Sequence, residues 1–397
     1  MKKLVAKIVF FLMALSVNAQ QFTLQGTAAV VNSNTFRLTQ DTFSQAGLIT
    51  SLYPLNLTQN FELNFELFLG SNYGGGADGI AIMFSKNCNP TLTAGQGLAV
   101  GGTPNSLITE FDTYDNGTGV FDVPQHHITI FKNGLMDQAD QVMDVVTQPV
   151  CASSTCGIID DNNWHAVKIK WEYLSATLQK LSVYFDSNLR VTSTRNHILN
   201  SFSNDPIVFY SFGGSTGAVT NFQQIRTNDD SVIQNVCSGG QVTIVAPELG
   251  TNYAWSIGGS TTNINNFTPT SSETVTCNYT DYCGINRTIS FTINLFPAIS
   301  LPNLSAVSPL CTGQNGVFTI NGTPGLVVEY TINNGTLQTL TIPASGTIAI
   351  TVNNPSGNQI VKITKVKNAN CEVDNLNINQ TIQVSQIPTT SAPIQTN

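Results

Sequence analysis

The chain has 397 residues with a formal net charge of -8, and only 10% of its residues are charged. This length exceeds that of a single sandwich domain and predicts two or three domains. The sequence has no dense basic run after its first residues, which argues against a nucleic-acid partner, and its poverty in charged residues favours extracellular β-structure over long helices.

Residues 1–19 are predicted to form an export signal. Lys2 and Lys3 give a positive start, a mostly apolar stretch from Val9 to Val17 follows, and Ala19 places cleavage before Gln20. The stretch is shorter than the roughly 20 residues that a spanning helix needs. No later segment is long and apolar enough to span a bilayer. We therefore expect a secreted or cell-surface protein without a membrane span.

Residues 20–230 consist of short alternating segments separated by turns. Phe61–Phe68 alternates apolar and polar residues, which is typical of a half-buried strand. Further strands are expected at 164–171, 181–185 and 207–210. The region is about the size of one large all-β sandwich. The side chains expected in its core are Phe61, Phe65 and Leu67, and those expected at the surface are His165 and His197.

The stretch from residue 110 to 127 carries the candidate chemistry. Glu110 and Asp112 are two apart on an expected strand, so both side chains point to the same face. Two adjacent carboxylates repel each other unless a cation lies between them. Asn116 and Asp122 add the hard oxygens that calcium takes, whereas His127 adds an imidazole that suits a transition ion. The cluster therefore predicts two unlike cation sites that share acids.

This pattern resembles legume lectins and their bacterial relatives of the concanavalin A-like fold, in which an E-x-D-x-aromatic-x-N run precedes D-(x)4-H. The resemblance implies an antiparallel β-sandwich of the jelly-roll type that holds calcium and a transition ion, usually manganese. The implied transition-ion ligands are Glu110, Asp112, Asp122 and His127, and the implied calcium ligands are Asp112, the Tyr114 carbonyl, Asn116 and Asp122. The gap from Asn116 to Asp122 is one residue longer than in many plant members. His126 is an alternative to His127 as the imidazole ligand, and the spacing from Asp122 favours His127.

Three further stretches support the resemblance. Ala77-Asp78-Gly79 is similar to the family's A-D-G element, whose aspartate accepts sugar hydroxyls and follows a cis peptide bond. Gly95-Gln96-Gly97 is similar to a loop that donates a backbone N–H to the ligand, with Gly95 and Gly97 as alternative donors. Phe212–Gly217 is similar to the closing strand and loop. The A-D-G element alone is weak evidence for the resemblance, but the four elements in this order are specific to the family. The resemblance covers about half of the chain.

The resemblance implies a carbohydrate site in which Asp78 accepts hydroxyl hydrogen bonds. Asn116 would keep its oxygen on calcium and turn its amide donors to the sugar, and the Tyr114 ring would pack on the apolar sugar face. We therefore expect a non-enzymatic lectin or adhesin for glycans or polysaccharides. Such sites bind single sugars weakly, so avidity from several copies, as in a homo-oligomer, is expected.

Two other functions compete with this interpretation. Laminarinase-type glycoside hydrolases share the sandwich and carry an E-x-D-x-x-E run, which residues 110–115 superficially match. Asp115 is five residues after Glu110, so on an unbulged strand it would face the opposite side, whereas a retaining pair lies only about 5–5.5 Å apart. The second competitor is a structural surface protein with a degenerate lectin scaffold.

Two shorter β-rich units are expected at residues 235–297 and 300–386. Each is near the size of an immunoglobulin-like sandwich and loosely resembles the Cys-bearing modules of large secreted bacterial proteins, so we expect a spacer role. Residues 387–397 form a polar tail for which disorder is expected.

The eight cysteines of an exported chain favour disulfides over metal thiolates. The pairings that the spacing suggests are Cys151–Cys156, Cys311–Cys371 and Cys237–Cys283. Cys88 and Cys277 then have no obvious partner, and the sequence leaves the connectivity open.

Overall fold

The computed structural model describes residues 21–117, 122–136, 146–227 and 233–385, and this part of the chain is almost entirely β-structure. The expected export signal and the expected tail at 387–397 lie outside the described residues. Across the described ranges, no helix has both the length and the apolar character needed to cross a membrane.

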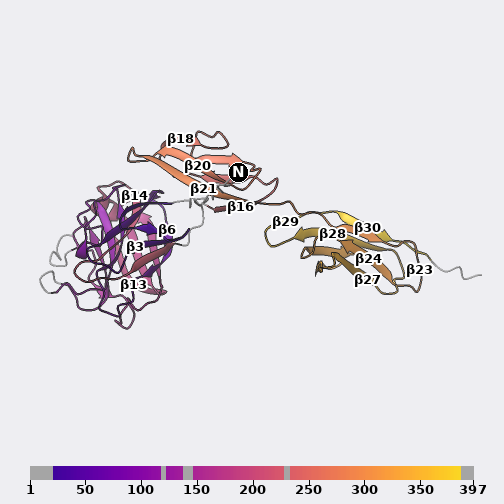
Figure 1. Ribbon diagram of the computed structural model, residues 1–397, viewed down its shortest axis with the longest axis horizontal. Helices are drawn as coiled ribbons and strands as arrows, with labels where there is room; N and C mark the ends of the chain where they lie inside the picture. The colour runs from indigo at the N-terminus through magenta and orange to yellow at the C-terminus, as the bar shows by residue number, and fades with distance from the viewer. Residues whose placement is uncertain (1–20, 118–121, 137–145, 228–232, 386–397) are drawn as a thin grey trace, which may run out of the picture. The chain divides into compact units, whose positions relative to one another are not determined.

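The N-terminal part of the chain is a sandwich of two antiparallel sheets (Figure 1). The strands of the first sheet are β1 (Phe22–Gly26), β4 (Ala46–Ser51), β5 (Leu55–Asn56), β7 (Gly79–Ser85), β8 (Ser106–Asp112), β9 (His127–Lys132), β10 (Val150–Cys151) and β14 (Ile207–Ser215). They are ordered β1-β4-β14-β7-β8-β9-β10, with β5 also paired to β14.

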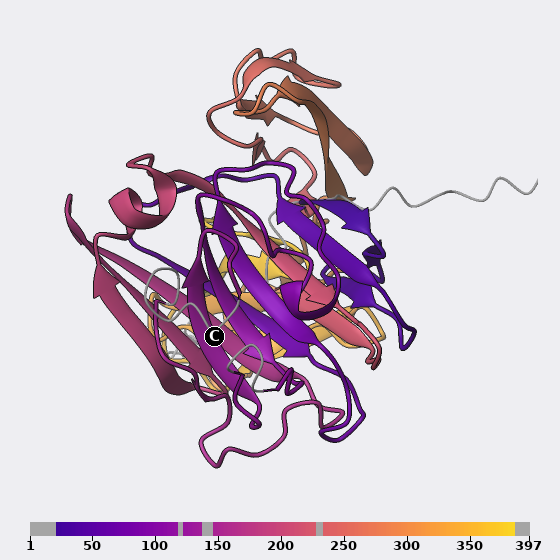
Figure 2. The same cartoon turned by 90° about the vertical axis from the view of Figure 1, so that its left-hand side faces the viewer.

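The second sheet is ordered β13-β12-β11-β6-β15-β3-β2. Its strands are β2 (Ala29–Val30), β3 (Thr35–Thr39), β6 (Phe61–Phe68), β11 (His165–Ser175), β12 (Leu178–Phe185), β13 (Asn188–Arg195) and β15 (Gln223–Thr227). Side chains from both sheets, including Phe65, Leu67, Trp171 and Phe212, share one hydrophobic core. The predicted all-β sandwich is therefore confirmed, and Figure 2 shows its strands side by side.

The four strands expected from alternation are all present, although three have different bounds. β6 spans the predicted segment. β11 begins one residue later than expected, β12 begins three residues earlier, and β14 ends five residues later. Phe65 and Leu67 are buried as expected, and Phe61 is half-buried against the same core.

The expectation that His165 and His197 lie at the surface is wrong. His165 is 7% exposed, and its ring stacks on Phe185 with 4.8 Å between centroids. His197 is fully buried at the start of the short helix α1 (His197–Phe202), where its ring lies 5.7 Å from that of Trp171. Both rings use their apolar faces in packing, which a polarity pattern does not reveal.

β7 and β8 are buried along their whole length. On one side they face the core of the sandwich. On the other side Met83 and Ile108 join a second apolar cluster with Leu98 and Val100, which follow the 3-10 turn η1 (Gly95–Gly97). The two central strands are thus held from both faces, which gives the loops at their ends a rigid base.

Several smaller sheets follow the sandwich in the chain. The first group of strands is β16 (Ile233–Cys237), β17 (Val242–Val245), β18 (Thr251–Trp255), β19 (Ile264–Phe267), β20 (Glu273–Thr280) and β21 (Asn286–Phe296). They form a four-stranded sheet β16-β21-β20-β18 and a pair β17-β19.

The remaining strands pack around a separate core that includes Phe318, Val328 and Ile363. They are β22 (Asn303–Ala306), β23 (Leu310–Cys311), β24 (Gly316–Asn321), β25 (Val327–Ile332), β26 (Gln338–Thr341), β27 (Thr347–Val352), β28 (Gln359–Lys367), β29 (Glu372–Val373), β30 (Ile378–Ile382) and β31 (Val384–Ser385). Their main sheets are β22-β24-β27 and β26-β25-β28-β29.

The chain divides into two compact units whose boundary passes through the sheet β16-β21-β20-β18. The first unit contains the sandwich and residues 243–267 and 274–292, and the second contains residues 234–242, 268–273 and 293 onward. Because this division follows neither 235–297 nor 300–386, those boundaries and the immunoglobulin-like character of the units stay predictions.

The disulfide between Cys151 and Cys156 is present as expected, but the other two suggested pairings are wrong. The structure instead joins Cys88 to Cys283 and Cys237 to Cys371, and leaves Cys277 buried and Cys311 exposed as free thiols. Pairing requires Cα atoms within about 7 Å. Spacing along the chain does not determine that distance once strands from distant segments meet.

Candidate metal and carbohydrate site

Three neighbouring strands bring the predicted acids and imidazole to one edge of the first sheet. β8 lies between β7 and β9, with Gly79 opposite Asp112 and Asp112 opposite His127. Asp78 immediately precedes β7, Asp112 ends β8, and His127 begins β9. The register therefore gathers side chains that are up to 49 residues apart in the chain.

Glu110, Asp112 and His127 are all buried, and each offers one ligand atom within 4.8 Å of the others. Nε2 of His127 lies 3.8 Å from Oε2 of Glu110 and 3.7 Å from Oδ1 of Asp122. Nδ1 of His127 lies 3.1 Å from the carbonyl oxygen of Gln125. Because a carbonyl oxygen only accepts, Nδ1 carries the proton and Nε2 turns its lone pair to the acids.

The electrostatics of this cluster fit a bound cation. Burial, reinforced by the charges of Asp112 and Asp122, raises the pKa of Glu110 well above its usual value. Burial and the Asp122 charge raise the pKa of Asp112 in the same way, and burial lowers the pKa of His127. Oε2 of Glu110 is buried without a hydrogen-bond partner among the described residues. A divalent cation would compensate the acids and accept the neutral imidazole.

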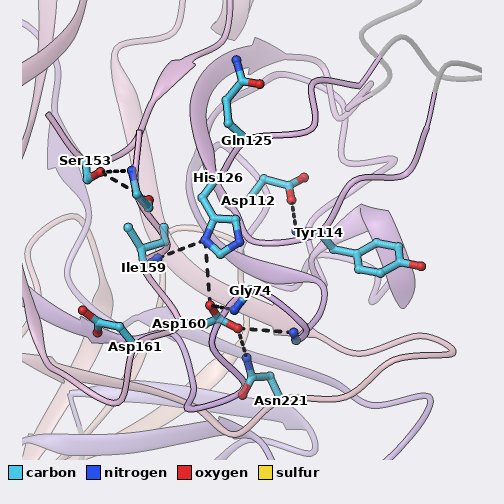
Figure 3. Close-up of polar contacts among 12 residues, drawn as sticks. Gly74, Asp112, Tyr114, Gln125, His126, Ser153, Ile159, Asp160, Asp161 and Asn221 are labelled. Atoms are coloured by element: carbon cyan, nitrogen blue, oxygen red, sulfur yellow. Dashed lines mark hydrogen bonds and ion pairs between the residues drawn. The ribbon is translucent and has the colours of Figure 1, made fainter. Parts of the chain in front are cut away.

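The loop after β8 is folded around two of these carboxylates. Oδ1 of Asp112 accepts the backbone N–H of Tyr114 at 2.6 Å, as Figure 3 shows, and Oδ2 of Asp122 accepts that of Asn116 at 2.7 Å. Residues 118–121 of this loop lie outside the described ranges. The Tyr114 ring points away from the polar cluster and is 36% exposed. The described part of the loop is thus held by hydrogen bonds from its backbone to the carboxylates of Asp112 and Asp122.

Asp78 presents an unsatisfied carboxylate beside this loop. The cis peptide bond that the resemblance implies is present between Ala77 and Asp78. The Asp78 backbone N–H donates to Ser215 O at 2.9 Å, and its carbonyl accepts from Thr113 N–H at 3.2 Å. The residue is 5% exposed, and its Oδ2 has no hydrogen-bond partner among the described residues. Burial raises the pKa of Asp78 to about 6.

Two glycines form the wall opposite the Asp78 carboxylate. A methyl group added at Gly217 would lie 3.5 Å from Asp78 Oδ2 and 3.8 Å from the Gly95 Cα. A methyl group at Gly95 would meet no atom within 4 Å, whereas one at Gly97 would lie 2.6 Å from Oγ1 of Thr93. Of the two glycines that the sequence offered, Gly95 therefore borders open space next to Asp78, and Gly97 packs inward.

Sequence reasoning missed Asp160, which organises the segment before Asp78. Its fully buried carboxylate accepts the N–H of Gly74 at 2.6 Å and that of Gly76 at 3.3 Å (Figure 3). Nδ1 of His126 accepts the N–H of Ile159 and lies 3.9 Å from Asp160 Oδ1. His126, the competing imidazole, is thus turned toward Asp160, and His127 lies beside Glu110. The only sequence signal for Asp160 is an acidic pair before a strand.

Comparison with known proteins finds matches to the N-terminal part of the chain. The family model described as the legume lectin beta-barrel domain matches residues 14–229. The pesticidal crystal protein Cry22Aa of Bacillus thuringiensis is 31% identical over 219 residues, covering 50% of this chain and 30% of that protein. The serine-rich adhesin for platelets of Staphylococcus aureus (strain MSSA476) is 26% identical over 222 residues, covering 52% of this chain and 10% of the adhesin. The chain thus spans less than a third of either relative.

Solved structures with similar folds include plant lectins. The lectin from Bauhinia forficata in complex with GalNAc has a TM-score of 0.42 and 20% identity, covering 54% of this chain and 92% of the lectin. Lectin I-B4 from Griffonia simplicifolia, in its metal-free form, has a TM-score of 0.41 and 18% identity, covering 55% of this chain and 93% of the lectin.

Proposed function

Because this chain belongs to the legume lectin beta-barrel domain family through residues 14–229, we propose that it is a secreted or cell-surface lectin or adhesin that binds carbohydrate without catalysis and requires divalent cations. The observation that carries the proposal is the buried Asp78 carboxylate, whose Oδ2 lacks a hydrogen-bond partner and faces Gly217. A buried acceptor of this kind is costly unless a ligand supplies donors. Sugar hydroxyls are neutral donors that fit beside a glycine wall.

The proposed cation sites use the residues that surround the end of β8. Glu110, Asp112, Asp122 and His127 would hold a transition ion such as Mn²⁺, and Asp112, Asp122, the Tyr114 carbonyl and Asn116 would hold Ca²⁺. The cations neutralise the buried acids and tie the loop to the sheet. Because Thr113 N–H donates to the Asp78 carbonyl, a loop fixed by cations also fixes the peptide that carries Asp78.

The proposed sugar contacts come from three segments. Asp78 accepts hydroxyl hydrogen bonds, the Gly95 backbone N–H donates one, and the Asn116 side chain donates from its amide nitrogen while its oxygen stays on calcium. The half-exposed Tyr114 ring packs on the apolar face of the sugar. Avidity from several copies, in a homo-oligomer or on a surface, then compensates for weak binding of one sugar. The similarity to a staphylococcal adhesin supports an adhesive role.

The geometry gives no support to a hydrolase built on Glu110 and Asp115. β8 ends at Asp112, and Asp115 Oδ1 accepts the N–H of Gly117 in the loop beyond it. The two acids therefore do not share a strand. If wild-type protein released reducing ends from β-glucans and Glu110→Gln abolished that release, the hydrolase would replace our proposal.

A glycan array tests the proposed function. We expect wild-type protein loaded with Ca²⁺ and Mn²⁺ to be retained on a subset of glycans and to be released by chelator. Asp78→Ala should abolish retention but keep its cations, since Asp78 is not among their ligands. The matched control is Asp186→Ala, which removes a half-exposed carboxylate 2.9 Å from His165 and should bind like wild type. Retention of Asp78→Ala at the wild-type level, or no retention of wild type on any glycan, would contradict the proposal.

A further inference from the structure

Two strongly exposed aromatic side chains, Phe43 and Tyr73, belong to loops that adjoin the Asp78 segment. Among the described residues, four aromatic side chains are at least 36% exposed, namely Phe43 at 69%, Tyr73 at 64%, Tyr282 at 45% and Tyr114 at 36%. Tyr114 belongs to the proposed site. Phe43 and Tyr73 are more exposed than Tyr114, and no contact proposed above uses them. Their positions relative to Asp78 follow from the backbone hydrogen bonds of their loops.

The Phe43 loop is hydrogen-bonded to the glycine wall of the site. Ser44 N–H donates to Gly217 O at 3.2 Å, and Oγ1 of Thr216 donates to Thr42 O at 2.7 Å. The residues on both sides of Phe43 are therefore tied to residues 216 and 217. Since Gly217 faces the Asp78 carboxylate, the backbone that carries Phe43 lies on the Gly217 side of the site.

The Tyr73 loop leads directly into Asp78. Tyr73 N–H donates to Asp160 O at 3.0 Å, and the carboxylate of Asp160 holds the next residues through Gly74 and Gly76. Tyr73 precedes Asp78 by five residues, a distance of at most about 18 Å along the chain. Its ring therefore lies within the reach of a short oligosaccharide bound at Asp78.

The conformation of Tyr73 is unusual for its residue type. Its φ is +49°, in the left-handed region that a side chain with a Cβ disfavours. Residues held in this region persist when the surrounding structure fixes them, and they concentrate at binding sites. Here Asp160 fixes the loop, and the result is a large, solvent-exposed ring in the segment that leads into Asp78. Packing of the ring against the protein does not explain this conformation, because the ring is 64% exposed.

We propose that Phe43 and Tyr73 contact sugar units beyond the one held at Asp78, so that the ligand is an uncharged oligosaccharide or polysaccharide chain. The inference rests on the proposed function. Aromatic rings pack on the apolar face of a sugar ring without requiring a particular hydroxyl pattern. Residues 42–45 and 71–76 contain no charged side chain, which favours a neutral glycan over an anionic one.

The test compares single sugars with short chains of the same sugars. The probes are the methyl glycosides of mannose, galactose and glucose, and mannotetraose, galactotetraose and cellotetraose, titrated calorimetrically into cation-loaded protein. For the sugar that binds, we expect the tetrasaccharide to bind about tenfold more tightly than the methyl glycoside. Phe43→Ala and Tyr73→Asn should each weaken tetrasaccharide binding about fivefold and leave methyl glycoside binding unchanged.

Two choices keep the result interpretable. Asparagine tolerates the left-handed region better than alanine does, so Tyr73→Asn removes the ring without straining the loop. Tyr282→Ala is the matched control, because it removes an exposed ring that lies outside the loops around Asp78, and it should bind both probes like wild type.

The outcomes separate this inference from the function on which it rests. Equal affinity of wild type for the methyl glycoside and the tetrasaccharide, or tetrasaccharide binding that survives both substitutions unchanged, overturns the role of Phe43 and Tyr73 and leaves the lectin function intact. Wild-type protein that binds none of the six probes and is retained on no glycan of the array overturns both. If the array selects another sugar, the methyl glycoside and the tetrasaccharide of that sugar replace these probes.

Discussion

Glu110 is a buried carboxylate that folding places beside two other acids. Its pKa is raised well above the usual value of 4.5 by burial first and then by Asp112 and Asp122. The stabilisation that goes with a raised folded-state pKa is complete below the unfolded value and is lost as pH rises through the folded value. Without a cation, the contribution of Glu110 to stability therefore falls as pH rises above its unfolded-state pKa.

This fall of stability with rising pH leads to a prediction for chelator-treated protein. Glu110→Gln should melt at a higher temperature than wild type at pH 8, by a few degrees, since each unit of pKa elevation corresponds to about 1.4 kcal/mol. The advantage should shrink toward pH 5, because wild-type Glu110 takes up its proton there. Thermal unfolding of both proteins in chelator from pH 5 to 8 measures it. An advantage that grows as pH falls would contradict the assigned environment.

Asp160 supports a second prediction about a single carboxylate. Asp160→Asn replaces one acceptor oxygen with a donor facing the N–H groups of Gly74 and Gly76, so the segment before Asp78 should loosen. We expect glycan affinity to fall about tenfold while the cation content stays at the wild-type level. Calorimetry and elemental analysis on the same sample measure both quantities.

The control for Asp160 is its neighbour. Asp161→Asn alters a carboxylate that pairs with His165 at 3.1 Å and touches neither glycine. It should bind glycan like wild type. Asp160 would be a purely structural residue if Asp160→Asn lost cations and glycan binding in parallel.

Single residues were predictable where their chemistry is written in a short local motif. Asp78 and the acids between 110 and 127 lie in such motifs, and the structure brings Glu110, Asp112 and His127 together. Asp160 was missed because its partners Gly74 and Gly76 are more than 80 residues away. The surface assignment of His197 failed because an imidazole can be buried when its ring packs on an aromatic residue and a carbonyl accepts from it.

At the scale of elements, the site depends on the register of β7, β8 and β9. Asp112 lies between Gly79 on one side and His127 on the other. With Asp122, it is one of the two acids that the proposed cation sites share, whereas Asp78 precedes β7 and is proposed to contact the sugar.

This arrangement predicts different cation contents for two aspartate variants. Asp112→Ala should lose both cations and all glycan binding, and Asp78→Ala should lose glycan binding but keep both cations. Elemental analysis of each purified, cation-replete variant makes the comparison. Equal cation loss in the two variants would show that the roles of Asp78 and Asp112 are not separate.

A strand could be predicted from the sequence where one of its two faces is exposed to solvent. β6 alternates between buried and exposed positions and was found with its full length. β8 is buried on both faces, so its sequence does not show the alternation of apolar and polar residues that marks a half-buried strand. Its acids were recognised from the motif instead. The end of β14 was missed because Gly213 and Gly214 continue the strand, and glycines usually signal its end.

At the scale of the whole molecule, the structure defines which cysteines form disulfides and which remain free thiols. The sequence left this pairing open. Cys237 and Cys371 close a separation of 134 residues, and Cys88 and Cys283 one of 195. No spacing rule reaches across such distances, because the pairing follows from how distant strands meet.

This pairing predicts the reactivity of the two free cysteines. Cys311 is exposed and should be alkylated in the native protein. Cys277 is fully buried, and burial raises its pKa to about 11, so it should react only after unfolding. Mass spectrometry of non-reduced digests, with one alkylating reagent before unfolding and another after it, measures both. Native alkylation of Cys277 would contradict the packing around β20.

The central claim is that cations bound by residues between 110 and 127 hold the loops that form a carbohydrate site around Asp78. The most direct measurement is calorimetric titration of an array-selected glycan into protein that is loaded with Ca²⁺ and Mn²⁺, then stripped by chelator, then reloaded, with elemental analysis at each stage. We predict about two divalent cations per chain in the loaded forms, no binding after stripping, and full recovery on reloading. Glycan binding that persists in the stripped protein, or a loaded protein without bound divalent cations, would contradict it.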